Sequence, residues 1–203
     1  SDLRICHEAG VAMVYAPRAS TMYPDGFDSR VVVGRIGDVL EGESRTGHYD
    51  GVATVVSKLF NIVAPDVAYF GQKDFQQTLV VKRMVADLDI ATEIRVVPTV
   101  RESDGLALSS RNVRLNSAAR RRAVAIPRAI SEVSEMFGRG ERDSSKLEAR
   151  ACEIMAEAGL TVDYARVANS RDLRSTSLAE VGDVFLIAAI VDGVRLIDNA
   201  ILG

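Results

Sequence analysis

The sequence has few of the features that are typical of membrane proteins, disulfide-rich proteins or nucleic-acid-binding proteins. Only two cysteines occur in 203 residues, and basic and acidic residues nearly balance, at 25 against 28. The longest apolar run, residues 184–191, falls far short of the roughly 20 residues that cross a bilayer. Without an excess of positive charge, the chain as a whole does not attract a polyanion. We therefore expect a globular protein with no membrane span and no nucleic-acid partner.

The cysteines and histidines show no metal-ligand spacing. Cys6 and Cys152 lie far apart, and neither His7 nor His48 follows them at the interval of a zinc site, so no metal site is predicted. Two reduced thiols in a cytoplasmic protein are the favoured interpretation, and one disulfide is the alternative. The first residues also lack the basic and apolar segments of a secretory signal peptide.

Residues 1–99 alternate between helical and strand patterns. Apolar residues at helical spacing predict helices over residues 2–10, 51–64 and 74–88. Short apolar runs predict strands over residues 11–15, 31–33 and 67–70, and a further strand is predicted over residues 93–97 after the second long helix. The polar, glycine-rich stretch 34–51 is predicted to be mostly loop. Because alternating strands and helices are typical of a parallel sheet, this part is predicted to be an α/β domain.

Residues 100–203 follow a different pattern and are predicted to form a smaller α+β domain. Helices are predicted over residues 117–137, with a kink or break at Pro127, and 144–158. Strands are predicted over residues 162–167, 184–191 and 194–197. The dipeptide Asp192-Gly193 between the last two is typical of a β-hairpin, which indicates an antiparallel sheet.

The first candidate site is the turn Gly71-Gln72-Lys73-Asp74, directly after a predicted strand. Open parallel sheets bind ligands beyond the carboxyl ends of their strands. Gly71 lets a ligand approach the backbone, Lys73 offers a charge for phosphate, and Asp74 can cap the next helix or accept from a ribose hydroxyl. The alternative is a plain strand–helix turn with a solvated lysine.

The second candidate site is the loop Gly105–Asn112, which follows the strand predicted at 93–97. Ser109, Ser110, Arg111 and Asn112 present hydroxyls, a guanidinium and an amide, groups that grip phosphate oxygens. With a glycine hinge and no apolar anchors, the loop is predicted to move until a ligand binds. The alternative is a hydrophilic connection between domains. Since both loops follow neighbouring strands, together they favour an anionic or nucleotide ligand.

Two other polar features, the arginine segment 120–122 and His48, are weaker candidates for a functional site. The basic segment Arg120–Arg122 has no interleaved aromatic residues, so a solvated helix face is favoured over a nucleic-acid site. His48 is either a general base or a hydrogen-bonded loop histidine, and the second interpretation is favoured. No Gly-x-Ser-x-Gly motif is present, which leaves a serine hydrolase without support.

Several segments together resemble the pantothenate synthetase (pantoate–β-alanine ligase) family. They are MYPDG (22–26), LEGESRTGHYDGVATVVSKLFNIVAPD (40–66), FGQKDFQQ (70–77), LSSRN (108–112) and RLIDN (195–199). The resemblance is to the C-terminal two thirds of that family's chain. It implies the remnant of a Rossmann-like nucleotide-binding domain over residues 1–99 and a lid domain over residues 100–203. It also implies a ligase that uses ATP to join pantoate to β-alanine through a pantoyl-adenylate.

The resemblance also implies roles for individual residues. Lys73 and Arg111 would be catalytic, neutralising charge as the α-phosphate is attacked. Gln77 would bind pantoate, and Val100 would contact adenine through its backbone. The residues implied for ATP are Gly71, Gln72, Lys73, Asp74, Val100, Leu108, Ser109, Ser110 and Arg111.

These residues contain no His-x-Gly-His segment, where the resemblance places the catalytic histidine, half the ATP site and the acidic groups near Mg²⁺. We therefore expect an N-terminally truncated piece with no turnover of its own, whose parent is a cytoplasmic homodimer using Mg²⁺ bound largely outside this chain. One alternative is a non-catalytic nucleotide-binding or dimerisation module. Another is an adenylate-forming transferase for a different acid, which Gln77 argues against.

Overall fold

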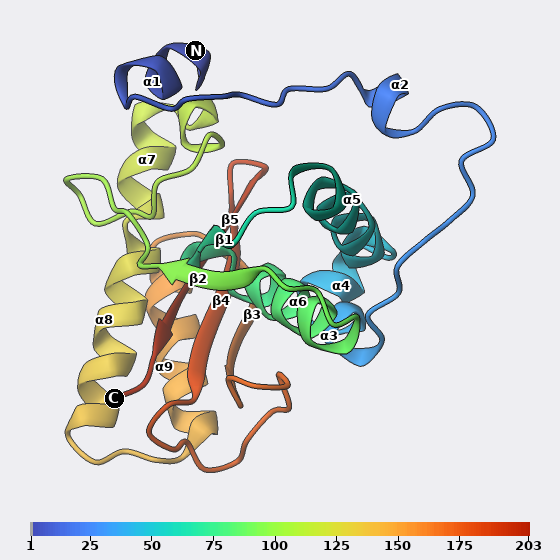
Figure 1. The fold of residues 1–203 in the computed structure, drawn as a ribbon. Coiled ribbons are helices and arrows are strands. Elements are labelled where there is room, and N and C mark those ends of the chain that lie inside the picture. The colour runs from blue at the N-terminus through green and yellow to red at the C-terminus, as the bar shows by residue number, and fades with distance from the viewer. Residues whose placement is uncertain (1) are drawn as a thin grey trace.

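The computed structural model describes residues 2–203, an α/β part followed by an α+β part (Figure 1). The first part contains α1 (Asp2–Glu8), α2 (Ala19–Met22), α3 (Arg35–Asp38), α4 (Glu41–Ser44), α5 (His48–Val63), β1 (Val67–Gly71), the 3₁₀ turn η1 (Gln72–Asp74), α6 (Phe75–Asp87) and β2 (Glu93–Val97). The second contains η2 (Asn112–Arg114), α7 (Ser117–Ala123), α8 (Ala125–Gly138), α9 (Ser144–Glu157), β3 (Thr161–Ala168), β4 (Val184–Val191) and β5 (Val194–Ile201). Among residues 2–203, no helix has the length and apolarity to cross a bilayer.

The two strands of the first part pair in parallel, as predicted. β1 and β2 are in register from Val67 opposite Glu93 to Gly71 opposite Val97, and α6 connects them. Apolar side chains of α5 and α6 meet in a small core that includes Ala53, Val80 and Met84. Because both strands end at the same edge of the sheet, the two candidate loops leave from neighbouring points.

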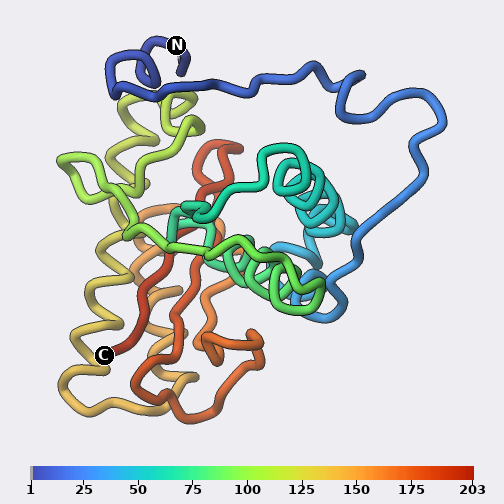
Figure 2. Tube along the Cα trace, viewed as in Figure 1, coloured from blue at the N-terminus to red at the C-terminus, as the bar shows by residue number. Residues whose placement is uncertain are grey.

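The strands predicted at residues 11–15 and 31–33 are wrong. Both segments are irregular and belong to a long connection on the outside of the molecule (Figure 2). Met13 is 85% exposed, and residues 11–15 form no part of a core. Val31 and Val33 pack against the core of α5 and α6, but they do so without pairing as a strand. An apolar run becomes a strand only when another strand pairs with it, and among the described residues none does. The stretch 34–51 is also less irregular than predicted, because it holds α3, α4 and the first turn of α5.

The second part is a three-stranded antiparallel sheet, in the order β3-β4-β5, with α8 and α9 packed against it (Figure 1). The predicted hairpin is confirmed: Asp192 and Gly193 have φ angles of 46° and 75°, and Val191 pairs with Val194. The long helix predicted over 117–137 is interrupted at Val124, three residues before Pro127. Pro127 therefore lies in the first turn of α8, where its missing N–H costs no helical hydrogen bond.

The arginine segment of α7 does not simply face solvent, as had been predicted. Arg120 donates to Glu102 and Asp104, and Arg122 pairs with Asp192 in the hairpin. Two of the three guanidinium groups therefore tie α7 to neighbouring loops.

A separate apolar cluster joins the two parts of the chain. It contains Val184 and Leu186 of β4, with Leu40, Phe75 and Leu79 from the first part packed against them. This packing brings the antiparallel sheet up to the end of β1. The domain boundary between residues 99 and 100 stays a prediction.

Candidate functional site

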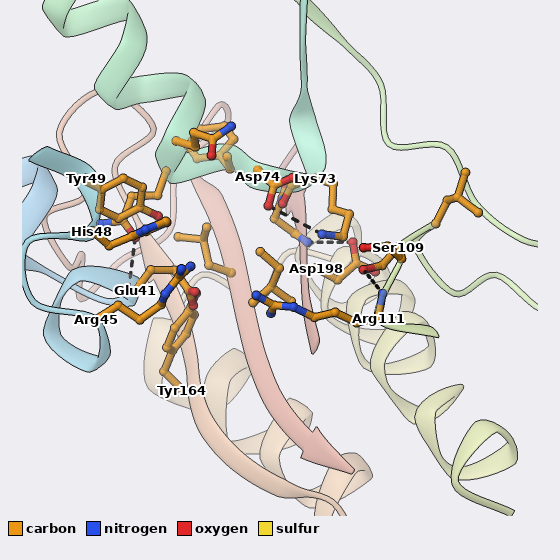
Figure 3. Close-up of a pocket in the computed structure, with 18 residues that line it drawn as sticks. Glu41, Arg45, His48, Tyr49, Lys73, Asp74, Ser109, Arg111, Tyr164 and Asp198 are labelled. Carbon is orange, nitrogen blue, oxygen red and sulfur yellow. Dashed lines mark hydrogen bonds and ion pairs between the residues drawn. The ribbon is translucent and has the colours of Figure 1, made fainter. Parts of the chain in front are cut away.

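A polar pocket of about 350 Å³ lies where the loops after β1 and β2 meet β5 and the start of α5. Figure 3 shows one group of side chains around Lys73 and Arg111 and another around Glu41 and His48. The lining residues are Glu41, Arg45, His48, Tyr49, Lys73, Asp74, Phe75, Gln76, Gln77, Leu108, Ser109, Ser110, Arg111, Tyr164, Leu186, Ile197, Asp198 and Asn199.

Lys73 reaches this pocket because β1 ends in a tight 3₁₀ turn before α6. Its side chain is 19% exposed, and Nζ lies 3.6 Å from a carboxylate oxygen of Asp74. Asp74 occupies the N-cap position of α6 but makes no side-chain capping hydrogen bond. The alternatives of a solvated lysine and a capping aspartate are therefore not what the structure shows. Both side chains face the same polar space.

The second loop enters the pocket with its hydroxyl and guanidinium groups. Leu108, Ser109, Ser110 and Arg111 all line the pocket. The Arg111 backbone N–H donates to Ser109 Oγ at 3.2 Å, and its guanidinium donates to the carbonyl oxygen of Arg195 at 3.1 Å. The structure thus brings the two predicted cations, Lys73 and Arg111, into one pocket from successive loops of the parallel sheet.

The prediction that the loop Gly105–Asn112 lacks apolar anchors is wrong. Leu106 and Ala107 are 2% and 4% exposed, and Leu106 belongs to the main core. Asn112 is also buried and donates from Nδ2 to Glu102 Oε1 at 2.6 Å and to the Ala107 carbonyl at 3.0 Å. Hydrogen bonds from the Arg120 guanidinium lower the pKa of Glu102. The ends of the loop are therefore fixed, and Ser109 and Ser110 between them have the freedom to respond to a ligand.

This anchoring changes the prediction for loop mobility. We expect the amides of Ser109 and Ser110 to exchange hydrogen faster than those of Leu108 and Asn112 in the ligand-free chain. The N–H groups of Leu108 and Asn112 donate to the carbonyls of Val100 and Ser109, whereas those of Ser109 and Ser110 have no acceptor among the described residues. Hydrogen exchange read by mass spectrometry or NMR measures this directly. Uniform exchange from residue 105 to 112 would contradict the anchored-loop description.

Three residues implied for ATP lie outside the pocket lining. Val100 is 66% exposed, and its carbonyl accepts the N–H of Leu108 at 2.9 Å. Gly71 is the last residue of β1, directly before η1. The Gln72 side-chain amide donates from Nε2 to Asn199 Oδ1 at 3.4 Å. Their contacts with ATP stay predictions.

The two glutamines at the start of α6, Gln76 and Gln77, differ in burial and in hydrogen bonding. Gln76 is 4% exposed and donates to the carbonyls of Ile36 and Val39 at 2.8 and 2.7 Å, so its amide fixes the segment before α4. Gln77 is half-buried and lines the pocket. Of the pair, Gln77 has the side chain without such structural hydrogen bonds among the described residues.

Sequence reasoning gave no role to Glu41, Tyr164 and Arg195. Glu41 is buried and accepts from the Arg195 guanidinium through both oxygens at 2.6 Å, and from Tyr164 Oη at 2.9 Å. Burial raises the pKa of Tyr164, so its hydroxyl stays protonated. The residues come from α4, β3 and β5, far apart in the chain, and only the polar segment RLIDN within an apolar strand hinted at them.

His48 and Arg45 complete this end of the pocket. His48 is the first residue of α5 rather than a loop residue, and it lines the pocket. Burial, with a smaller effect from Arg45, lowers the pKa of its imidazole, which favours the neutral form. A neutral imidazole can accept a proton, and the role of His48 as a general base stays a prediction.

Comparisons with known proteins agree with one another. A family model described as "Pantoate-beta-alanine ligase" matches residues 1–201. The pantothenate synthetase of Gluconobacter oxydans is 49% identical over 98% of this chain and 72% of its own length. The crystal structure of the enzyme from Thermus thermophilus superposes with a TM-score of 0.94 at 42% identity, covering 98% of this chain and 72% of the other.

A relative from Francisella tularensis was solved in complex with "Beta-gamma ATP" and β-alanine. It matches with a TM-score of 0.75 at 31% identity, over 98% of this chain and 68% of its own. The family model and the relatives cover almost the whole chain. The chain therefore belongs to the pantoate–β-alanine ligase family.

Proposed function

We propose that this pocket activates pantoate with ATP in the ligase that joins pantoate to β-alanine. The observation that carries the proposal is the convergence of Lys73 and Arg111 on one polar pocket from the two loops that follow β1 and β2. This edge of a parallel sheet is where such folds bind nucleotides. The Francisella relative, whose title names an ATP ligand and β-alanine, supports ATP and β-alanine as substrates here.

The proposed chemistry has two steps. A carboxylate oxygen of pantoate attacks the α-phosphorus of ATP, the bond to the bridging oxygen breaks, and pyrophosphate leaves. Negative charge grows on the phosphate oxygens, where Lys73 and Arg111 stabilise it from fixed positions. The amine of β-alanine then attacks the acyl carbon, and AMP leaves. Neutral His48 offers one acceptor for the proton that this amine must lose.

The proposal assigns substrates to parts of the pocket. ATP lies along the first group of side chains, with Asp74 accepting from the ribose and Ser109, Ser110 and Arg111 holding phosphate oxygens. Gly71, Gln72, Val100 and Leu108 contribute backbone or packing contacts to the nucleotide. Pantoate lies beside Gln77, whose amide both donates and accepts hydrogen bonds. A homodimer in the cytoplasm remains part of the proposal.

Mg²⁺ is expected with ATP, but the residues that the structure describes do not form a site for it. Glu41 and Asp198 are each bound to an arginine through both carboxylate oxygens. Within residues 2–203, no three His, Cys, Asp or Glu side chains gather as a metal site. We therefore give Mg²⁺ no ligand here, and no step above depends on it.

Experiments on turnover use a chimera in which this chain replaces the matching part of the Gluconobacter oxydans enzyme. In this chimera we expect Gln77→Ala to raise the Michaelis constant for pantoate about tenfold, because a lost hydrogen bond to a polar substrate costs roughly 1–3 kcal/mol. The constant for ATP should change little. Initial rates at varied pantoate and ATP measure both constants.

Gln76→Ala is not a neutral control, because the buried Gln76 amide holds the segment before α4. We expect that variant to lower the melting temperature, whereas Gln77→Ala leaves it nearly unchanged. Lys82→Ala, an exposed change on the same helix, serves as the matched control. A Gln77→Ala variant that weakens ATP instead of pantoate would refute the assignment.

A further inference from the structure

The last strand of the chain contacts both loops that carry the proposed catalytic cations. β5 lies beside η1 and the loop 101–112, although about a hundred residues separate them in sequence (Figure 1). Strand β5 carries three polar residues, Arg195, Asp198 and Asn199, in an otherwise apolar strand, and the last two line the pocket. Buried polar side chains are retained where they make specific hydrogen bonds. Their partners therefore indicate what this segment does.

Asn199 binds the turn that carries Lys73. It is 2% exposed, and its Nδ2 donates to the carbonyl oxygens of Gln72 at 3.0 Å and of Lys73 at 2.9 Å. Its Oδ1 faces the Gln72 side-chain amide at 3.4 Å. The asparagine thus uses both amide protons on two consecutive carbonyls of η1. This arrangement fixes the backbone from which the Lys73 side chain extends.

Asp198 and Arg195 hold the loop that carries the second cation, Arg111. The buried carboxylate of Asp198 accepts from both guanidinium nitrogens of Arg101 at 2.7 and 3.0 Å, and Arg101 donates onward to the Gly105 carbonyl at 3.0 Å. The carbonyl of Arg195 accepts from the Arg111 guanidinium at 3.1 Å. The loop that carries Arg111 is therefore attached to β5 at its base, through Arg101, and at its other end through the Arg111 side chain.

We infer that β5 sets the spacing of Lys73 and Arg111, and that Asn199 is the positioning residue for Lys73. Without the Asn199 amide, nothing else from β5 among the described residues donates to the Gln72 and Lys73 carbonyls. A cation displaced by about 1 Å from a developing charge loses much of its effect on rate, as much as a hundredfold. The catalytic consequence rests on the proposed function, but the positioning itself does not.

The positioning is tested in the 203-residue chain by hydrogen exchange. We compare Asn199→Ala with Val194→Ala, which removes apolar volume from the core end of the same strand. At conditions of equal unfolding free energy, the amides of residues 72–76 should exchange about tenfold faster in Asn199→Ala than in Val194→Ala. Equal exchange in the two variants overturns the inference, since Asn199 would then contribute only to general stability.

The catalytic consequence is tested in the chimera. Asn199→Asp keeps the shape of the side chain but replaces its donors with a carboxylate oxygen that faces two carbonyl oxygens. We expect kcat for pantoate activation to fall about tenfold to a hundredfold, with Michaelis constants for ATP and pantoate within about threefold of the parent. Val194→Ala should retain the parent kcat. A full kcat in folded Asn199→Asp would show that volume, not hydrogen bonding, matters at this position.

The two tests distinguish failure of the proposed function from failure of the inference about Asn199. If the unmodified chimera does not activate pantoate, the proposed function fails while the exchange result on η1 still stands. If the chimera is active and Asn199→Asp is as fast as the parent, the inference fails while the proposed function stands.

Discussion

Replacing Lys73 with alanine in the chimera is expected to slow pantoate activation by about a hundredfold to a thousandfold, the usual cost of removing one fixed donor at a developing oxyanion. The Lys73 side chain is only 19% exposed, and it enters the pocket that Arg111 also lines. Its charge is therefore held in place before the reaction begins. Single-turnover formation of AMP or pyrophosphate, measured by rapid quench, gives the rate of this step.

Two comparisons separate the charge from packing. Lys73→Met keeps most of the buried stem and removes the charge, so it should be nearly as slow as Lys73→Ala. Lys82→Ala removes an exposed lysine from the neighbouring helix and should leave the rate unchanged. Binding of preformed pantoyl-adenylate should weaken less than the rate falls. Near-normal single-turnover activation in Lys73→Met would show that the charge of Lys73 does not contribute to this step.

The 203 residues alone are expected to show no measurable ligase turnover, whereas the chimera should be active. The resemblance places the family's catalytic histidine in a His-x-Gly-His segment, and neither His7 nor His48 stands in such a motif. Pantothenate formation from ATP, pantoate and β-alanine, followed by mass spectrometry, compares the two proteins. Circular dichroism should show first that both are folded. Turnover by the isolated chain near that of the chimera would contradict this prediction.

The sequence predicted elements best where the local pattern and the tertiary context agree. β4 and the Asp192-Gly193 hairpin lie where predicted, because an apolar run bounded by turn residues finds a pairing partner in the fold. β2 also lies where predicted and pairs with β1. The pattern at residues 11–15 is as apolar, yet it forms no strand, since no strand of the described residues lies alongside. A local apolar pattern indicates that a segment can form a strand, but it does not show whether another part of the chain pairs with that segment.

The candidate site was likewise predicted in part. The glycine-bounded turn with Lys73 and the Ser-Ser-Arg loop stand out because each concentrates phosphate-binding groups in a few consecutive residues. Glu41, Tyr164 and Arg195 could not be recognised in this way, because their hydrogen bonds join residues more than a hundred positions apart. Gln76 shows the limit of spacing arguments: it adjoins Gln77, but its amide is used to hold the segment before α4.

Exchange of labelled pyrophosphate into ATP by the chimera tests the central claim most directly, because it requires reversible formation of pantoyl-adenylate in this pocket. We predict exchange that depends on pantoate, needs no β-alanine and is lost in Lys73→Met. Exchange that does not require pantoate, or pantothenate formation without any pantoate-dependent exchange, would contradict the assignment of this pocket to pantoate activation.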